Sequence, residues 1–221
     1  MTALLRYQTS LLLRSQRWLP PVILYAAFLG IGVQTGQPVL DSLGYAAAPL
    51  VPVAAWLVRI CATNEPPAAR SCAAAAAGPG RAHLACLLVA LASAALLGAA
   101  ATVLVTAISD PSSGDRSADV SVLAAGAAGL LAALVCALIG TAVGALTTWP
   151  LLRSPGKAVP AMLIAALLAL VVSGSPARTA VTDLVTGSET GTVPSGVLPL
   201  LLALLLTAGA TSLACAITSR R

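Results

Sequence analysis

Long apolar segments separated by short polar ones make up most of this chain. A helix that crosses a bilayer needs about 20 mainly apolar residues, and six segments resemble such helices. They cover residues 18–33, 43–61, 83–108, 120–148, 158–173 and 195–217. The pattern predicts an all-α membrane protein with six transmembrane helices in a single domain over residues 1–221.

Residues 1–17 have a different pattern, in which apolar and polar side chains share one amphipathic segment. The leucines Leu4, Leu5, Leu11 and Leu12 can lie on one broad face, and Arg6, Gln8, Arg14 and Gln16 lie largely elsewhere. Such a helix lies in the membrane interface rather than across the bilayer. The alternative is a frayed N-terminal tail.

The loop at residues 62–82 has the sequence ATNEPPAARSCAAAAAGPGRA. Asn64 is a plausible helix cap, and the two prolines that follow Glu65 suit a first helical turn. The alanine-rich residues 68–77 favour a helix, which Gly78, Pro79 and Gly80 end before Arg81 returns the chain to the membrane. The loop is therefore expected to hold a short helix parallel to the membrane; the alternative is a passive linker.

The remaining connections are short, at residues 34–42, 109–119 and 174–194. The last of them contains residues 177–185, which are expected to form a short helix on the outer surface. Gly187 and Gly191 are expected to end this helix.

Hydrophobic residues make up 58% of the chain and charged residues only 9%, against about a quarter charged in soluble domains. Lipid is therefore the solvent of the fold. The formal charge of +5 comes from isolated basic residues at helix ends, with no aromatic platform between them. These residues suit lipid headgroups and set the topology, and they do not indicate a nucleic-acid surface.

The charges separate between the two ends of the predicted helices. One end has ten of the 12 basic residues and a single acid, Glu65: Arg6, Arg14, Arg17, Arg59, Arg70, Arg81, Arg153, Lys157, Arg220 and Arg221. The other end has Arg116 and Arg178 with six of the seven acids: Asp41, Asp110, Asp115, Asp119, Asp183 and Glu189. Because basic loops stay cytoplasmic, both termini are predicted inside. The excess of arginine over lysine indicates a GC-rich bacterial genome, which places the protein in a bacterial cytoplasmic membrane.

The predicted spans lack the groups that most membrane chemistry needs. No Asp, Glu, Lys or His lies at mid-membrane depth, which argues against ion-coupled carriers and haem proteins. No span pairs a nucleophile with a base, and residues 156–157 lack the rest of a P-loop. The five cysteines lie inside the membrane or on the cytoplasmic side and form no metal motif. We therefore assign no catalytic residue, cofactor or metal, and any ATP hydrolysis must come from another chain.

Small residues recur every four positions in the fourth span. They are Ala128, Ala132, Cys136, Gly140 and Gly144. Small side chains let helix backbones approach closely in lipid. This stripe is either an intramolecular packing face or a dimer face.

The interfacial segment up to Arg17, the six spans with both termini inside, and loop 62–82 together resemble a type-2 ABC transporter permease, the six-helix class of exporters. In many members the corresponding loop has a Glu that opens a short coupling helix, then a Pro-containing turn with an Arg before the third span. Here Glu65 and the turn from Gly78 to Arg81 occupy those places. Glu65-Pro66 replaces the usual Glu-Gly.

The resemblance implies a homo- or heterodimer of permease subunits, each with its coupling helix docked on a separate cytoplasmic ABC ATPase subunit. It implies export, and the charge-poor spans favour a hydrophobic or amphipathic substrate. The residues expected at the ATPase contact are Asn64, Glu65, Arg70, Pro79 and Arg81. The alternative function is a non-transporting assembly, regulatory or immunity protein that binds a cytoplasmic partner through residues 62–82.

Overall fold

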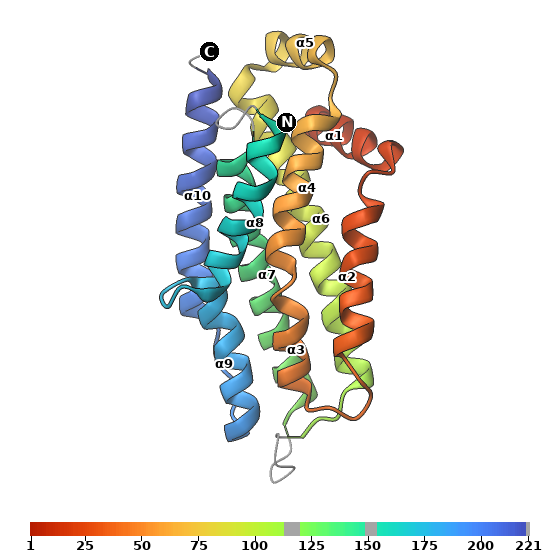
Figure 1. The fold of residues 1–221 in the computed structure, drawn as a ribbon, viewed down its shortest axis with the longest axis vertical. Helices are drawn as coiled ribbons and strands as arrows, with labels where there is room; N and C mark the ends of the chain where they lie inside the picture. Colours follow the sequence, from red (N-terminus) through yellow and green to blue (C-terminus); the bar gives the residue numbers. More distant parts are fainter. Residues whose placement is uncertain (113–119, 149–153, 220–221) are drawn as a thin grey trace.

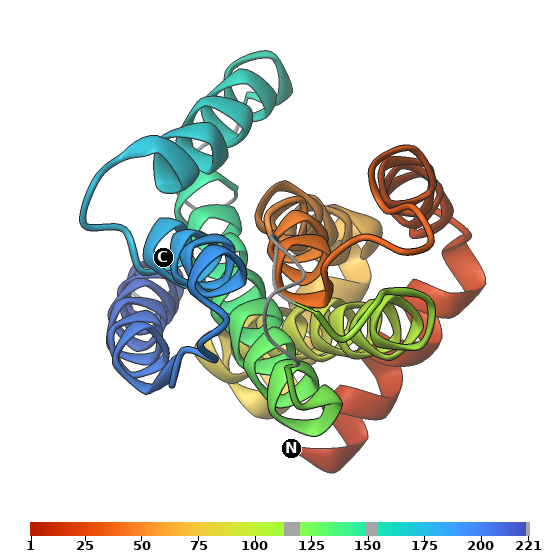
Figure 2. The same ribbon diagram turned by 90° about the horizontal axis from the view of Figure 1, so that it is seen from below.

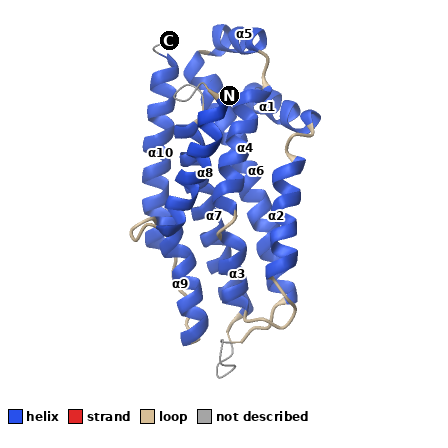
Figure 3. Ribbon diagram, in the orientation of Figure 1, coloured by secondary structure: helices blue, strands red, loops and turns tan. Residues whose placement is uncertain are grey.

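The computed structural model describes residues 1–112, 120–148 and 154–219. These residues fold into a bundle of α-helices joined by short loops (Figure 3). The helices are α1 (Thr2–Ser15), α2 (Leu19–Gly32), α3 (Val39–Ala47), α4 (Leu50–Asn64), α5 (Pro67–Ala77), α6 (Pro79–Ile108), α7 (Val122–Thr147), α8 (Pro155–Val171), α9 (Pro176–Thr190) and α10 (Val197–Ser219).

Four helical segments are long and apolar enough to cross a membrane: α3 with α4, α6, α7 and α10. The pair α8 and α9, bent by 45° at their junction, makes a fifth candidate. The predicted first span corresponds to α2, which has only 14 residues. At 1.5 Å per residue it is about 21 Å long, shorter than the bilayer core of about 30 Å. The chain is therefore an all-helical, multi-pass membrane protein with four to five candidate spans.

The outer faces of the bundle are apolar, as a lipid-facing surface requires. On α10, for example, Leu198 and Leu205 are 67% and 71% exposed, and Ile31 of α2 is 78% exposed. In a bilayer these side chains contact acyl chains rather than water.

Helix α7 forms the centre of the bundle and contacts α3, α4, α6, α8, α9 and α10. Seen from below in Figure 2, it lies between α6 on one side and α8, α9 and α10 on the other. Most of its inward-facing positions are small, which lets several neighbours approach its backbone at once.

The predicted small-residue stripe on α7 faces α4 of the same chain. A Cβ atom added at Gly144 would come within 2.6 Å of Val58 Cβ, and one at Gly140 would be 2.7 Å from Ala54 Cβ and closer still to the Val51 carbonyl oxygen. The stripe continues through Ala132 and Cys136, which are 3% and 0% exposed. These positions therefore pack helices within one chain.

The span made by α3 and α4 is interrupted at residues 48 and 49. Pro49 and Pro52 have no N–H group, so two hydrogen bonds of the helical ladder are absent here. The Tyr25 hydroxyl of α2 donates to the Ala46 carbonyl oxygen at 2.8 Å, and both groups are buried. In lipid, where an unpaired carbonyl is unfavourable, this bond attaches α2 to the interruption.

Helix α9 differs from its prediction in length and position. It runs to Thr190, with Gly187 inside it, and ends where Gly191 adopts a left-handed conformation with φ 68°. It extends lengthwise beside α3 (Figure 1) and buries Ala177, Ala180 and Leu184. The predicted helix at residues 177–185 is present and ends at Gly191 as expected, but it is longer than predicted and continues through Gly187. Its Ala177, Ala180 and Leu184 form an apolar face at helical spacing that is buried in the bundle.

The two ends of the bundle differ in structure. Helices α1 and α5 and the C-terminal end of α10 lie at one end (Figure 1). At the opposite end, the loops before α3 and after α6 are joined by backbone hydrogen bonds, from Val39 N–H to Asp110 O at 3.1 Å and from Asp110 N–H to Gln37 O at 2.9 Å. The end with α1 and α5 is called the basic end below, since α1, α5 and the start of α6 have arginines and Glu65 is its single described acid.

We predict that Gly140→Ala destabilises the protein by about 1–3 kcal/mol, because the new methyl group forces α4 and α7 apart. The matched control is Gly209→Ala on α10, where an added Cβ meets nothing within 4 Å and stability should change by less than about 1 kcal/mol. The free energy of unfolding in mixed micelles, from an SDS titration, measures both. Equal effects at the two glycines would contradict the α4–α7 contact.

Candidate functional site

Helix α5 lies across the basic end of the bundle, between the ends of α4 and α6 (Figure 1). Pro66 is extended (ψ 146°) before its first turn, and Gly78 ends it with φ 88° before Pro79 opens α6. A positive φ of this kind suits glycine. None of the residues of α5 is buried. The predicted boundaries at 68–77 are within one residue of the structure, but the residue before the first turn is Pro66 and not the expected cap, Asn64.

Arg70 braces α5 against α4. Its Nη2 atom donates to the carbonyl oxygen of Ala62 at 2.9 Å and to that of Glu65 at 3.1 Å. The last carbonyls of a helix have no partner in their own helix, so a charged donor here stabilises the C-terminal end of α4. The first turn of α5 is thereby attached to the preceding span.

Glu65 and Asn64 connect the same turn to α1. Glu65 is only 7% exposed, and its Oε2 accepts a hydrogen bond of 3.2 Å from Gln8 Nε2, which is also buried. Asn64 Nδ2 donates to the Leu11 carbonyl oxygen at 3.0 Å. Desolvation and, after it, the Glu65 carboxylate raise the pKa of the nearby Tyr7 hydroxyl. Helix α1 is therefore held by the turn between α4 and α5.

The five residues expected at a partner contact do not share one surface. Pro79 and Arg81 are exposed, Asn64 and Arg70 are half-buried, and Glu65 is buried under α1. The accessible part of this region is thus the outer side of α5 with the start of α6. Glu65 instead holds two elements of the same chain together.

Gln8 was assigned to the polar side of α1, and this was wrong. It is buried with Leu12 against the bundle. The signal was present in the sequence, because Leu4, Leu5, Leu11 and Leu12 lie three or four residues on either side of Gln8. That spacing puts Gln8 in the middle of the apolar face. An isolated glutamine there indicates a buried polar partner.

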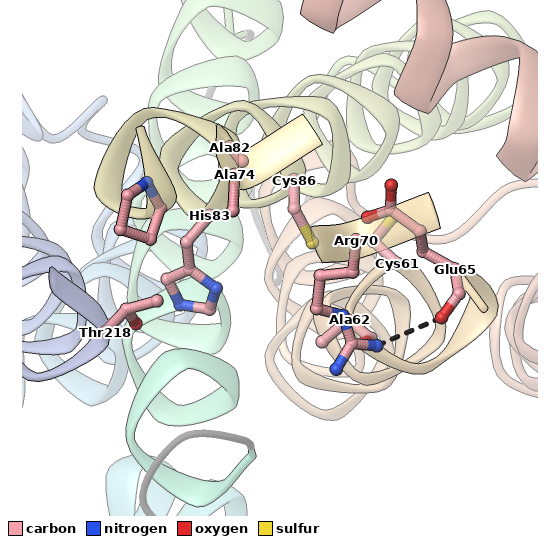
Figure 4. Close-up of a pocket in the computed structure, with 10 residues that line it drawn as sticks. Cys61, Ala62, Glu65, Arg70, Ala74, Ala82, His83, Cys86 and Thr218 are labelled. Carbon is pink, nitrogen blue, oxygen red and sulfur yellow. Dashed lines mark hydrogen bonds between the residues drawn. The ribbon is translucent and has the colours of Figure 1, made fainter. Parts of the chain in front are cut away.

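A small cavity of about 50 Å³ lies between α5 and the bundle. Its walls come from α4, α5, α6, α10 and the turn at Glu65 (Figure 4). The lining residues are Cys61, Ala62, Glu65, Arg70, Ala74, Pro79, Ala82, His83, Cys86 and Thr218. Within the described part of the chain, no group of three or more His, Cys, Asp and Glu side chains is placed to hold a metal ion. The five cysteines are free thiols.

Comparison with known proteins adds no relative: no protein-family model, curated protein or solved structure matches this chain. The fold and the site define the class, a multi-pass helical membrane protein with a short exposed helix lying across one end.

We predict that Gln8→Leu loosens α1, because it removes the donor from a buried carboxylate. Hydrogen bonds to charged groups contribute about 1.5–3 kcal/mol, so amide hydrogen exchange over α1 should become roughly tenfold to a hundredfold faster, as measured by mass spectrometry in nanodiscs. Thr9→Ala, on the exposed side of α1, is the control and should leave exchange unchanged.

The double variant Gln8→Leu with Glu65→Leu should restore slow exchange in α1, because two apolar partners leave no buried group unsatisfied. Fast exchange in the double variant, or unchanged exchange in Gln8→Leu alone, would show that the bond does not hold α1.

Proposed function

We propose that this chain is the membrane-spanning permease subunit of an ATP-driven exporter. It acts as a dimer with a second permease subunit and pairs with a separate cytoplasmic ABC ATPase subunit. Its substrate is hydrophobic or amphipathic, in keeping with spans that have few polar groups. The chain itself hydrolyses no ATP.

One observation supports this proposal most, the position of α5. A short helix that lies across the end of a bundle, is attached at both ends to spans and has no buried residue is suited to receive a force from a partner. Its outer residues are small, so the backbone of α5 can approach a groove in the partner closely. Nothing buried in α5 has to be exposed for it to move.

The charges support an orientation with the basic end in the cytoplasm. Arg6 and Arg14 of α1, Arg70 of α5, Arg81 of α6 and Lys157 of α8 lie on elements at this end. The described acids other than Glu65 lie on α3, α9 and the loop after α6. Loops rich in Lys and Arg remain in the cytoplasm. Both chain ends are then cytoplasmic, in a bacterial inner membrane.

In the proposed mechanism, Pro79, Arg81 and the outer side of α5 form the ATPase contact. Closure of the ATPase pair pushes α5, and α4 and α6 transmit the displacement to the spans. Because Glu65 and Asn64 bind α1 to the same turn, α1 moves with α5 along the membrane interface. The bundle alternates between states open to either side, or releases its substrate laterally.

The proposal requires an ABC ATPase subunit that co-purifies with this chain, and this requirement gives a direct test. We predict that Arg81→Glu weakens co-purification of the ATPase with the permease roughly tenfold, the effect of about 1.4 kcal/mol, and lowers export of substrate in parallel. Arg178→Glu, the same charge reversal on α9, is the control and should change neither. Full association and export with Arg81→Glu would refute the contact.

The orientation is tested separately by reporter fusions. A reporter that is active only in the periplasm should be active when fused after Arg116 and silent when fused after Arg70. The opposite pattern would reverse the orientation and place α5 outside the cell, away from any ATPase.

A second candidate function is a non-transporting assembly, regulatory or immunity protein that binds its partner through residues 62–82. The short α2 favours it, because an exporter of the six-helix class needs six spans and α2 has 14 residues. The two functions differ in substrate movement: export that depends on ATP hydrolysis in reconstituted vesicles supports the permease, and partner binding without export supports the second candidate.

A further inference from the structure

A groove of about 160 Å³ lies between α6 and α10, with α7 as its floor. Its described walls are six leucines, one alanine and three threonines, with no charged side chain among them. Helix α10 stands at the edge of the bundle (Figure 1) and contacts both α6 and α7. Among the four long candidate spans, α10 has the smallest buried share. The groove therefore lies where packing within the chain is least complete.

The groove opens on the outer, apolar surface of the bundle. Leu88 of α6 and Leu204 of α10 line it and are 40% and 46% exposed, whereas Leu138 on its floor is buried. Toward the basic end, α6 and α10 approach each other closely, since a Cβ atom added at Gly80 would lie 3.6 Å from the Cys215 carbonyl oxygen. An occupant consequently enters from the membrane side of the bundle.

The hydroxyl groups that line the groove are already bonded. Thr141 Oγ1 donates to Ala137 O at 2.7 Å. Thr207 Oγ1 donates to Leu138 O at 3.0 Å, and Thr211 Oγ1 donates to Thr207 O at 2.8 Å. None of the three hydroxyls has a proton left to donate. Bound water needs two to four polar partners, whereas an apolar cavity of about 150 Å³ stays dry and binds a hydrocarbon such as benzene. The groove is thus suited to hydrocarbon.

The depth of the groove corresponds to one leaflet of a bilayer. The leucines of α6 that line it run from Leu84 to Leu91. Arg81 is exposed and lies on the same side of α6, because residues 81, 84, 88 and 91 are three or four positions apart. Leu91 lies ten positions after Arg81, about 15 Å along the helix, which is half of a hydrocarbon core of about 30 Å. A lipid chain in the groove therefore has its headgroup at the level of Arg81.

We propose that this groove binds one acyl chain of an anionic phospholipid, taken from the leaflet at the basic end, with the headgroup beside Arg81. The guanidinium group matches the geometry of phosphate oxygens, and a basic residue near the membrane surface attracts an anionic lipid. The acyl chain fills the space that α6 and α10 leave open, so the lipid joins α10 to the bundle. The site belongs to this chain alone and does not depend on an ATPase partner.

Lipid titration of the delipidated protein in mild detergent tests the site, with native mass spectrometry to count bound lipids. The probe is phosphatidylglycerol with one palmitoyl and one oleoyl chain, and phosphatidylcholine with the same chains has no net charge. Ala208→Leu fills the groove. Ala216→Leu, at an exposed alanine of α10 outside the groove, is the matched control. Ala208→Met fills the same space with a more flexible side chain, in case the leucine prevents folding.

We expect the wild-type chain and Ala216→Leu to bind one phosphatidylglycerol with the same dissociation constant. Ala208→Leu and Ala208→Met should bind it roughly tenfold more weakly, because exclusion of about two methylene groups from the groove is enough for this change. Arg81→Gln should weaken phosphatidylglycerol roughly fivefold, the effect of one charge at the membrane surface, and leave phosphatidylcholine unchanged. Saturating phosphatidylglycerol should raise the unfolding temperature of the wild-type chain and not that of Ala208→Leu.

Unchanged affinity in the folded Ala208→Leu and Ala208→Met variants would overturn the proposal, because the lipid would then bind elsewhere. Equal affinities for the two lipids, unaffected by Arg81→Gln, would overturn the anionic headgroup. A dimer that forms in place of the lipid complex and is lost in Ala208→Leu would show that a second copy of the chain occupies the groove, which also overturns the proposal.

Discussion

Close contact between the backbones of α4 and α7 is the constraint on which the rest of this structure depends. Lipid offers no hydrophobic driving force between helices, so their association relies on van der Waals contact over a face without bulky side chains. Gly140 and Gly144 provide that face, and Val51, Ala54 and Val58 fill it. Once α4 is fixed against the central helix, the position of its C-terminal end is fixed as well.

Polar contacts at the C-terminal end of α4 connect it to both α1 and α5. Arg70 binds its last carbonyls from α5, and Asn64 and Glu65 bind α1 from the turn. Helices α1 and α5 are thus both attached by hydrogen bonds to the turn at the C-terminal end of α4. The spans are held together differently, mainly by packing of small side chains. Most hydroxyl groups there donate a hydrogen bond to a carbonyl oxygen of their own helix, as the Thr141 hydroxyl does to Ala137 O.

Features encoded locally could be predicted from the sequence. The bounds of α7 and α10 follow to within two residues from the length of each apolar run, and those of α5 from the prolines and glycine at its ends. Helix α6 begins at Pro79, inside the predicted turn and four residues before the predicted span. The burial of Glu65 could not be predicted, because its partner Gln8 is 57 residues away in the chain. The length of α9 was missed because Gly187 was expected to end the helix, whereas α9 runs to Thr190 and its face from Ala177 to Leu184 is buried in the bundle. The shortness of α2 is set by the turn at residues 16–18 and by Val33, whose extended backbone ends the helix.

The two supports of α5 differ in stiffness. Helix α6 runs without interruption for 30 residues, about 45 Å, from the basic end to the opposite loops. The other support, α4, stops at the proline-rich junction and continues as α3, which packs against α9, α7 and α6. One support is therefore a continuous helix, and the other has a break in its helical ladder at residues 48 and 49. The Tyr25 hydroxyl bonds to the Ala46 carbonyl oxygen beside this break, whereas α6 has no proline after Pro79. A bend of the bundle that begins at the basic end therefore meets the least backbone resistance at residues 48–52, because two hydrogen bonds of the helical ladder are absent there.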